Sequence, residues 1–165
     1  MTDAPAILEV PRPPATEGEA RLDFLQFVLG QAPQVDMPLK HLFPPGLYVR
    51  EITMPAGAVV ISRVHKFAHP FVISKGRLSV WSENDGIQHL AAPHTGITTP
   101  GTRRILFIHE ETIWTTFHAG PWHEGMDPDE IVGTVTWTPD VSYMKGVLEQ
   151  AHRDLETSLK QEIPA

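Results

Sequence analysis

The chain has 165 residues, 41% of them hydrophobic, and a formal net charge of −7 at pH 7. This length can enclose a real core in one domain, and the negative charge argues against nucleic acid as the main partner. The sequence has no cysteine and no apolar run near the ~20 residues of a transmembrane helix, so it predicts neither a disulfide nor a membrane partner.

The first 36 residues predict an arm followed by a helix. Residues 1–15 contain four prolines and favour extended backbone, either as a disordered tail or as an arm that docks on a neighbouring subunit. Residues 16–36 predict a short helix, about Thr16 to Leu29, and a linker. Thr16 can cap this helix, and two acidic residues suit its first turn.

Residues 37–137 alternate short β-branched segments with proline and glycine turns, which predicts an all-β, single-domain barrel. Strands are expected at Leu39–Phe43, Leu47–Met54, on either side of residues 66–68, at Arg77–Trp81, Ile87–Ala91, Thr102–Ile108, Thr112–His118 and Glu130–Trp137. Residues 138–165 predict a C-terminal amphipathic helix opened by Thr138, with apolar residues at spacings of three and four. Its apolar stripe is expected to pack on the barrel or on another copy of the chain.

Two histidines flank a bend in the segment from Gly57 to Gly76. On one straight strand His65 and His69 would lie about 13 Å apart, too far to share an ion. Pro70 excludes a helix through them. If residues 66–68 form a bend between antiparallel strands, both imidazoles can turn inward and meet.

These residues resemble a known family, the cupins, which are small jelly-roll barrels. The first cupin motif ends in a glutamate seven residues before a glycine, and here His69 stands seven residues before Gly76. The second motif histidine falls on His65, whereas the first falls on Arg63. The later motif, Pro-x-Gly followed by a histidine, is shortened to Pro100-Gly101, and its histidine position falls near Arg104. Residues 38–129 also resemble small cupin-like proteins of bacteriophages, through the segments LYVREI, SKG, TPGTRR and TIWTTFH.

The missing motif histidine has a candidate replacement in His118. A hairpin that turns at Glu111 would place His118 opposite Arg104, on the same face. His65, His69 and His118 would then form a three-histidine site for one divalent ion, Zn²⁺, Fe²⁺, Ni²⁺ or Mn²⁺. The alternative is that they are hydrogen-bonded barrel histidines with no ion. Three further histidines are expected away from this site, His109 exposed at the hairpin tip and His94 and His123 at the barrel mouth, as candidate outer contacts.

Two arginines share the faces of these histidines, Arg63 with His65 and Arg104 with His118. A guanidinium inside a barrel needs an anionic partner. The pair could clamp a carboxylate or phosphate ligand. Alternatively, each could pair with Glu51 or Glu83, or lie in water at the barrel mouth. Strand alternation predicts that Arg104, rather than Arg103, points inward, on the face of Leu106 and Ile108.

The resemblance implies two classes of function. The first is a metal-binding phage-type cupin that acts as a virion-associated or assembly component, as a homo-oligomer built through the arm and the C-terminal helix. The second is a three-histidine non-haem metal enzyme, a dioxygenase or isomerase, acting on a small acid or sugar. No carboxylate lies within the motif, so no catalytic residue is assigned. The chain has no signal-peptide pattern, and the expected location is the bacterial cytoplasm or the virion.

Overall fold

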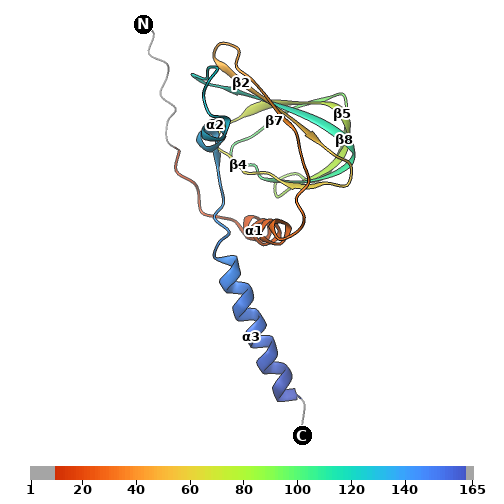
Figure 1. Ribbon diagram of the computed structural model, residues 1–165, viewed down its shortest axis with the longest axis vertical. Coiled ribbons are helices and arrows are strands. Elements are labelled where there is room, and N and C mark those ends of the chain that lie inside the picture. Colours follow the sequence, from red (N-terminus) through yellow and green to blue (C-terminus); the bar gives the residue numbers. More distant parts are fainter. Residues whose placement is uncertain (1–9, 163–165) are drawn as a thin grey trace. The chain divides into compact units, whose positions relative to one another are not determined.

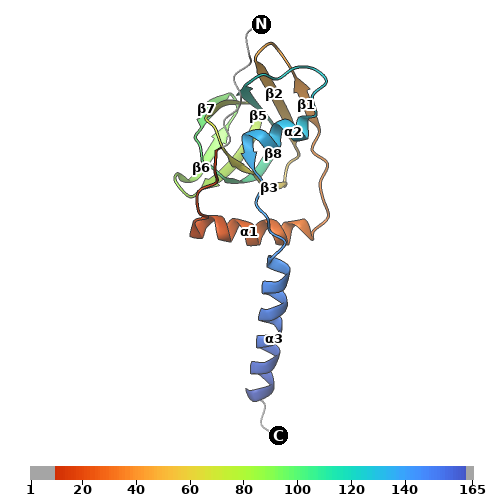
Figure 2. The same cartoon turned by 90° about the vertical axis from the view of Figure 1, so that its left-hand side faces the viewer.

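The computed structural model describes residues 10–162, with side chains up to residue 158. These residues divide into two compact units, residues 10–15 with 34–138, and residues 16–33 with 139–162. Residues 1–9 of the expected arm lie outside the described residues. The first unit is a β-barrel and the second contains two helices, so the expected all-β class with N-terminal and C-terminal helices is confirmed (Figures 1 and 2).

The barrel is built from antiparallel strands joined by short turns. Its strands are β1 (Leu39–Leu42), β2 (Leu47–Met54), β3 (Val59–Ile61), β4 (Val64–His65), β5 (His69–Ser82), β6 (Gly86–Ala91), β7 (His94–Thr98), β8 (Arg104–Ala119) and β9 (Thr136–Trp137). The order β1-β2-β8-β5-β6 forms the main path of a seven-stranded sheet, with β3 paired to β8 and β7 to β5. Strands β4 and β9 pair separately. The sheet curls around its interior (Figure 1).

Strand β8 corrects the expected hairpin at residues 109–111. Instead of turning, the chain continues as one strand of 16 residues, paired with β5 along much of its length. Glu110 and Glu111 are both exposed; Glu110 lies 3.2 Å from Arg77 Nε, and Glu111 lies 2.6 Å from Lys75 Nζ. The His-Glu-Glu run has the polarity of a turn, but cross-strand partners make it suitable for the outer face of a sheet.

The two long strands change register near Gly76, where β5 has irregular pairing with β8. Gly76 has φ +92°, and a Cβ there would overlap the backbone of β8, lying 2.7 Å from Thr112 Cα. Only glycine allows this backbone angle and this close approach together. The irregularity lets both strands bend around the barrel.

The barrel core is continuous and apolar. It contains Met54, Ala58, Phe71, Ile73, Leu78, Val80, Leu106, Ile108 and Trp114. Leu106 is 6% exposed and Ile108 fully buried, so the predicted inward face of this segment is confirmed. Alternation along the strand places Arg104 on the same face, at the end of the core.

Helix α2 (Pro128–Val135) replaces the strand expected from residue 130. The Asp127 side chain accepts a hydrogen bond from the Asp129 N–H, and proline occupies the first turn. Ile131 and Val135, one turn apart, are buried in a second cluster with Tyr48 and Trp122. The β-branched content of this segment suggested a strand, but the cap and the burial of one helical face decide in favour of the helix.

The second unit contains α1 (Glu17–Gly30) and α3 (Met144–Glu162). Thr16 caps α1 through a reciprocal capping box with Glu19, as predicted. Helix α3 begins six residues later than Thr138, because Asp140 accepts a hydrogen bond from the Ser142 N–H in a turn that precedes the helix. Residues 149–158 of α3 are all exposed. Among the described helices, none has the length and apolar character required to cross a membrane.

Candidate functional site

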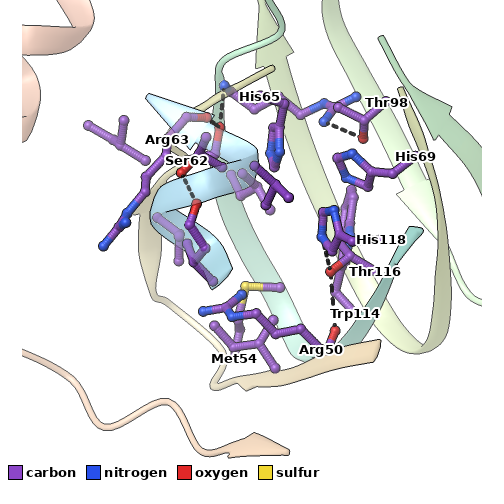
Figure 3. A pocket seen from close by; sticks show the side chains of 18 residues that line it. Arg50, Met54, Ser62, Arg63, His65, His69, Thr98, Trp114, Thr116 and His118 are labelled. Atoms are coloured by element: carbon purple, nitrogen blue, oxygen red, sulfur yellow. Dashed lines mark hydrogen bonds between the residues drawn. The ribbon is translucent and has the colours of Figure 1, made fainter. Parts of the chain in front are cut away.

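The three predicted histidines lie side by side at one end of the barrel (Figure 3). The ring centroids of His65 and His69 are 4.5 Å apart, and those of His69 and His118 are 4.3 Å apart. The bend at residues 66–68 therefore brings the first two rings together, as expected. The flanking strands do not pair with each other, however, because β4 pairs with β9 and β5 pairs with β7 and β8.

His118 reaches the cluster by a different route from the expected hairpin. Phe71 of β5 pairs with Thr116 of β8. Continuing two residues along each antiparallel strand brings His69 level with His118, on one face. The expected pairing of His118 with Arg104 is wrong, because β8 is one continuous strand, but the grouping of His118 with His65 and His69 does occur.

Burial keeps the three imidazoles neutral. Burial is the main cause and the neighbouring imidazole of His69 the next, and together with smaller charge effects they lower the pKa of His65 to about 2 and that of His118 to about 3. Burial also lowers the pKa of His69, although the contact with the Phe67 carbonyl opposes this shift. A neutral imidazole has one nitrogen with a free lone pair, which is the form that can bind a metal ion.

The hydrogen bonds identify the nitrogens that are free. The His69 Nδ1–H donates to the Phe67 carbonyl at 3.2 Å, which leaves the lone pair on Nε2. That Nε2 and the His65 Nδ1 are buried without a hydrogen-bond partner among the described residues. His118 Nε2 lies 3.1 Å from Thr116 Oγ1. Two buried imidazole nitrogens without partners are unusual, and each needs a ligand or a water molecule.

The donor set therefore fits a divalent ion in its chemistry. The three histidines are not in a metal-binding arrangement, however. Among the side chains that the structure describes, no three His, Cys, Asp or Glu side chains are arranged to hold an ion. The rings are tilted against one another, with interplanar angles of 51° and 38°. Metal loading would require these rings to turn.

A cavity of about 250 Å³ adjoins the histidines. It is lined by Arg50, Ile52, Met54, Val60, Ile61, Ser62, Arg63, His65, His69, Thr98, Arg104, Leu106, Trp114, Thr116, His118, Val132, Val135 and Thr136. The lining comes from seven strands and from α2 as well as the connecting residues, so distant parts of the sequence build one pocket.

Both predicted arginines line this cavity, in different ways. Arg104 Nη1 donates to Thr98 Oγ1 at 3.0 Å, and its guanidinium lies 5.6 Å from the Phe71 ring centroid. Arg63 is largely exposed and extends away from the three imidazoles (Figure 3). Arg103 does not line the cavity, as predicted, but it is buried, with Nε donating to the Ser62 carbonyl at 3.3 Å.

Arg50 is the charged cavity residue that the sequence analysis missed. It lies on β2, and its side chain runs across the lower part of the pocket in Figure 3. Alternation along this strand could have indicated it, because Ile52 and Met54 line the same cavity at steps of two residues. Burial lowers the pKa of Arg50, and the nearby positive charge of Arg63 acts in the same direction.

The remaining histidines lie outside the cavity. His94 belongs to β7 and packs its ring 5.8 Å from Phe71, and His123 is exposed, with Nδ1 near the Glu124 carbonyl. Neither lines the pocket, so their expected role as outer contacts is not supported. His109 is exposed, as predicted, although it lies within β8 and contacts Ser79 Oγ rather than forming a hairpin tip.

Comparison with family models and with curated proteins gives no match. Among solved structures, similar folds include an RmlC-like cupin with a double-stranded β-helix fold from Methanocaldococcus jannaschii, with 9% identity, a TM-score of 0.45, and coverage of 52% of this chain and 82% of that one. Another RmlC-like cupin, from Shewanella frigidimarina, has 20% identity, a TM-score of 0.43, and coverage of 53% and 78%. KdgF from Halomonas sp. has 16% identity, a TM-score of 0.45, and coverage of 59% and 91%.

The cupin descriptions agree with the fold that the sequence resemblance implies. At identities of 20% or less and TM-scores below 0.5, these similarities support no statement about what the chain binds or does. The phage-type part of the resemblance stays a prediction. Function therefore has to be argued from the pocket residues.

Proposed function

We propose that the chain is a small cupin-like protein that binds one divalent metal ion through His65, His69 and His118. The observation that carries this proposal is the contact of three imidazoles at one pocket, those of buried His69 and His118 and of half-buried His65. His65 Nδ1 and His69 Nε2 have no hydrogen-bond partners among the described residues. Burying a polar atom without a partner costs about 1–3 kcal/mol. A bound ion would remove this cost at both nitrogens.

The chain's own residues would prepare the site for an ion. The Phe67 carbonyl accepts from His69 Nδ1 and thereby keeps Nε2 as the donor atom. The lowered pKa values of all three imidazoles avoid competition between protons and metal near neutral pH. All-imidazole donors suit Zn²⁺, Fe²⁺, Ni²⁺ or Mn²⁺. An ion held this way would connect β4, β5 and β8, and could act as a Lewis acid towards a ligand in the cavity.

The proposed biological role is that of a virion-associated or assembly component, as the phage-type resemblance implies. The exposure of residues 149–158 of α3 supports a role in assembly, since apolar Leu155 is 59% exposed there. In addition, no Asp or Glu is among the described residues that line the cavity, so no carboxylate there can act as a general base.

The alternative proposal is a three-histidine metal enzyme, a dioxygenase or isomerase, acting on a small acid or sugar. One observation favours it: the histidines adjoin a cavity of about 250 Å³, whereas a purely structural ion needs no ligand space. Oxygen consumption by the Fe²⁺-loaded chain with a small acid would favour this alternative over the assembly role.

Titration with Co²⁺, which gives visible absorption that depends on coordination geometry, tests the proposed site. The untagged wild type should bind one equivalent, and His69→Gln should bind at least tenfold more weakly. His109→Gln, on the exposed face of β8, is the matched control and should bind as the wild type does. Equal binding by the His69→Gln and wild-type chains would reject the proposed site.

A further inference from the structure

The charges that line the cavity are all of one sign. Three guanidinium groups line it, those of Arg50, Arg63 and Arg104, and no carboxylate does so within the described part of the chain. The whole chain is acidic, with a net charge of −7. A positive pocket in an acidic protein is a local feature, and it cannot result from overall composition.

Arg50 is the most informative of the three. It is partly buried, and among the side chains described, residues 10–158, its guanidinium has neither a hydrogen bond nor an ion pair. The adjacent Glu51, expected as a candidate partner of Arg63 or Arg104, instead accepts a hydrogen bond from Thr115 Oγ1 at 3.2 Å. Its N–H groups are therefore available at the cavity wall, where they can donate to a planar anion such as a carboxylate.

Arg104 supplies a second positive charge that is held in place. Its Nη1 donates to Thr98 Oγ1, and its guanidinium packs over the Phe71 ring. These contacts occupy part of its donor set only, because a guanidinium has five N–H groups. Arg63 is exposed and contributes charge at the edge of the pocket.

Much of the rest of the wall is apolar, alongside the three histidines and several hydroxyl side chains. The apolar part contains Ile52, Met54, Val60, Ile61, Leu106, Trp114, Val132 and Val135. A fully hydrated inorganic anion gains nothing from such a wall, whereas an anion with an apolar body can bury it there. The volume of about 250 Å³ lies below the roughly 300–1,000 Å³ of pockets for drug-sized ligands, which limits the ligand to a small molecule.

We propose that this cavity binds a small carboxylic acid, with its carboxylate at Arg50 and its apolar body against Met54 and Trp114. This inference deepens the proposed function, since it names the ligand class of the same pocket. It does not require the metal ion, because the guanidinium groups and the apolar wall belong to the protein alone. Arg104 adds long-range attraction for the same charge.

An NMR titration of the full-length chain with isovalerate and benzoate tests the proposal, because this method detects millimolar affinities. At least one acid should bind, and its neutral amide, isovaleramide or benzamide, should bind at least tenfold more weakly. Arg50→Met should weaken binding of the acid about 30-fold or more. The matched control is Arg77→Met, on β5 outside the cavity, where Arg77 pairs with exposed Glu110; it should leave binding unchanged. If Arg50→Met does not fold, Arg50→Lys serves instead and should weaken binding severalfold by losing the planar fork.

Several results would overturn the proposal: no binding of either acid, equal binding of acid and amide, unchanged binding in the Arg50 variant, or binding of inorganic phosphate but of neither acid. The two proposals fail separately. Carboxylate binding in the presence of a chelator, by a chain that takes up no Co²⁺, would reject the metal site alone. Stoichiometric Co²⁺ binding without carboxylate binding would reject the carboxylate site alone.

Discussion

The buried imidazoles make the barrel sensitive to acid, and replacing one of them should reduce that sensitivity. In the unfolded chain a histidine has a pKa near 6.5, whereas burial holds His65 at about 2 and His118 at about 3 in the folded chain. Between these values the unfolded state binds more protons than the folded state. Stability is therefore lost as the pH falls below about 6.5, and the loss continues to about pH 3 for His118 and about pH 2 for His65.

The size of the effect at pH 5 depends little on the folded pKa values, because both lie well below 5. One pH unit is worth about 1.4 kcal/mol for each group, so each histidine lowers the free energy of unfolding by about 2 kcal/mol between pH 7 and pH 5. His65 and His118 together would cost about 4 kcal/mol, a large part of the stability of a typical domain.

Urea unfolding at pH 7 and at pH 5, with a chelator present, measures this loss. The wild type should lose more stability than His118→Gln by about 2 kcal/mol, and more than the double variant His65→Gln/His118→Gln by about 4 kcal/mol. Other titrating groups are common to all three chains, so they cancel in the comparison. If His118→Gln and the wild type lose the same stability over this range, the argument from buried neutral imidazoles is refuted.

Three further predictions concern the fold and the assembly. Gly76→Ala should lower the free energy of unfolding by about 2–4 kcal/mol. The control Gly57→Ala should lower it by about 1 kcal/mol, because Gly57 also has a positive φ but has open space around it. Equal losses in the two variants would show that the contact of Gly76 with β8 is unimportant. Thr16→Ala should cost about 1 kcal/mol of helix stability through loss of the capping box, measured by circular dichroism, and no change would contradict the cap. If the chain is a homo-oligomer, deletion of residues 1–15 or Leu155→Lys should dissociate it in light scattering while the barrel stays folded; unchanged assembly in both would contradict the proposed contacts.

The sequence predicted correctly those helices, strands and bends whose ends are fixed by a nearby glycine, proline or capping side chain. Strand Leu47–Met54 lies between two turns that require glycine, at Gly46 and Gly57, and it was predicted with the observed bounds. The start of α1 follows from the side chain of Thr16. The bend between His65 and His69 was predicted because Pro70 and the β-branched residues leave few alternatives.

The errors arise where distant partners decide the structure. Residues 109–111 are polar and therefore favoured a turn, but in the structure Glu110 and Glu111 pair with Arg77 and Lys75 of β5. The segment after Pro128 looks like a strand until its Ile131 is seen buried beside Tyr48 and Trp122. Single-sequence patterns cannot show these contacts, since most of them join residues dozens of positions apart. Arg50 differs: its position on an alternating strand was available, but a lone arginine gave no reason to select it.

Elemental analysis of the untagged chain, purified without a chelator, tests the central claim most directly. The proposed site predicts close to one divalent metal ion per chain in the wild type and almost none in His65→Ala/His69→Ala. Removal of the ion with a chelator should lower the melting temperature of the wild type, because the ion binds only the folded chain. A wild-type chain that contains no metal, takes up none when it is supplied, and melts at the same temperature with and without a chelator would contradict the proposed metal site.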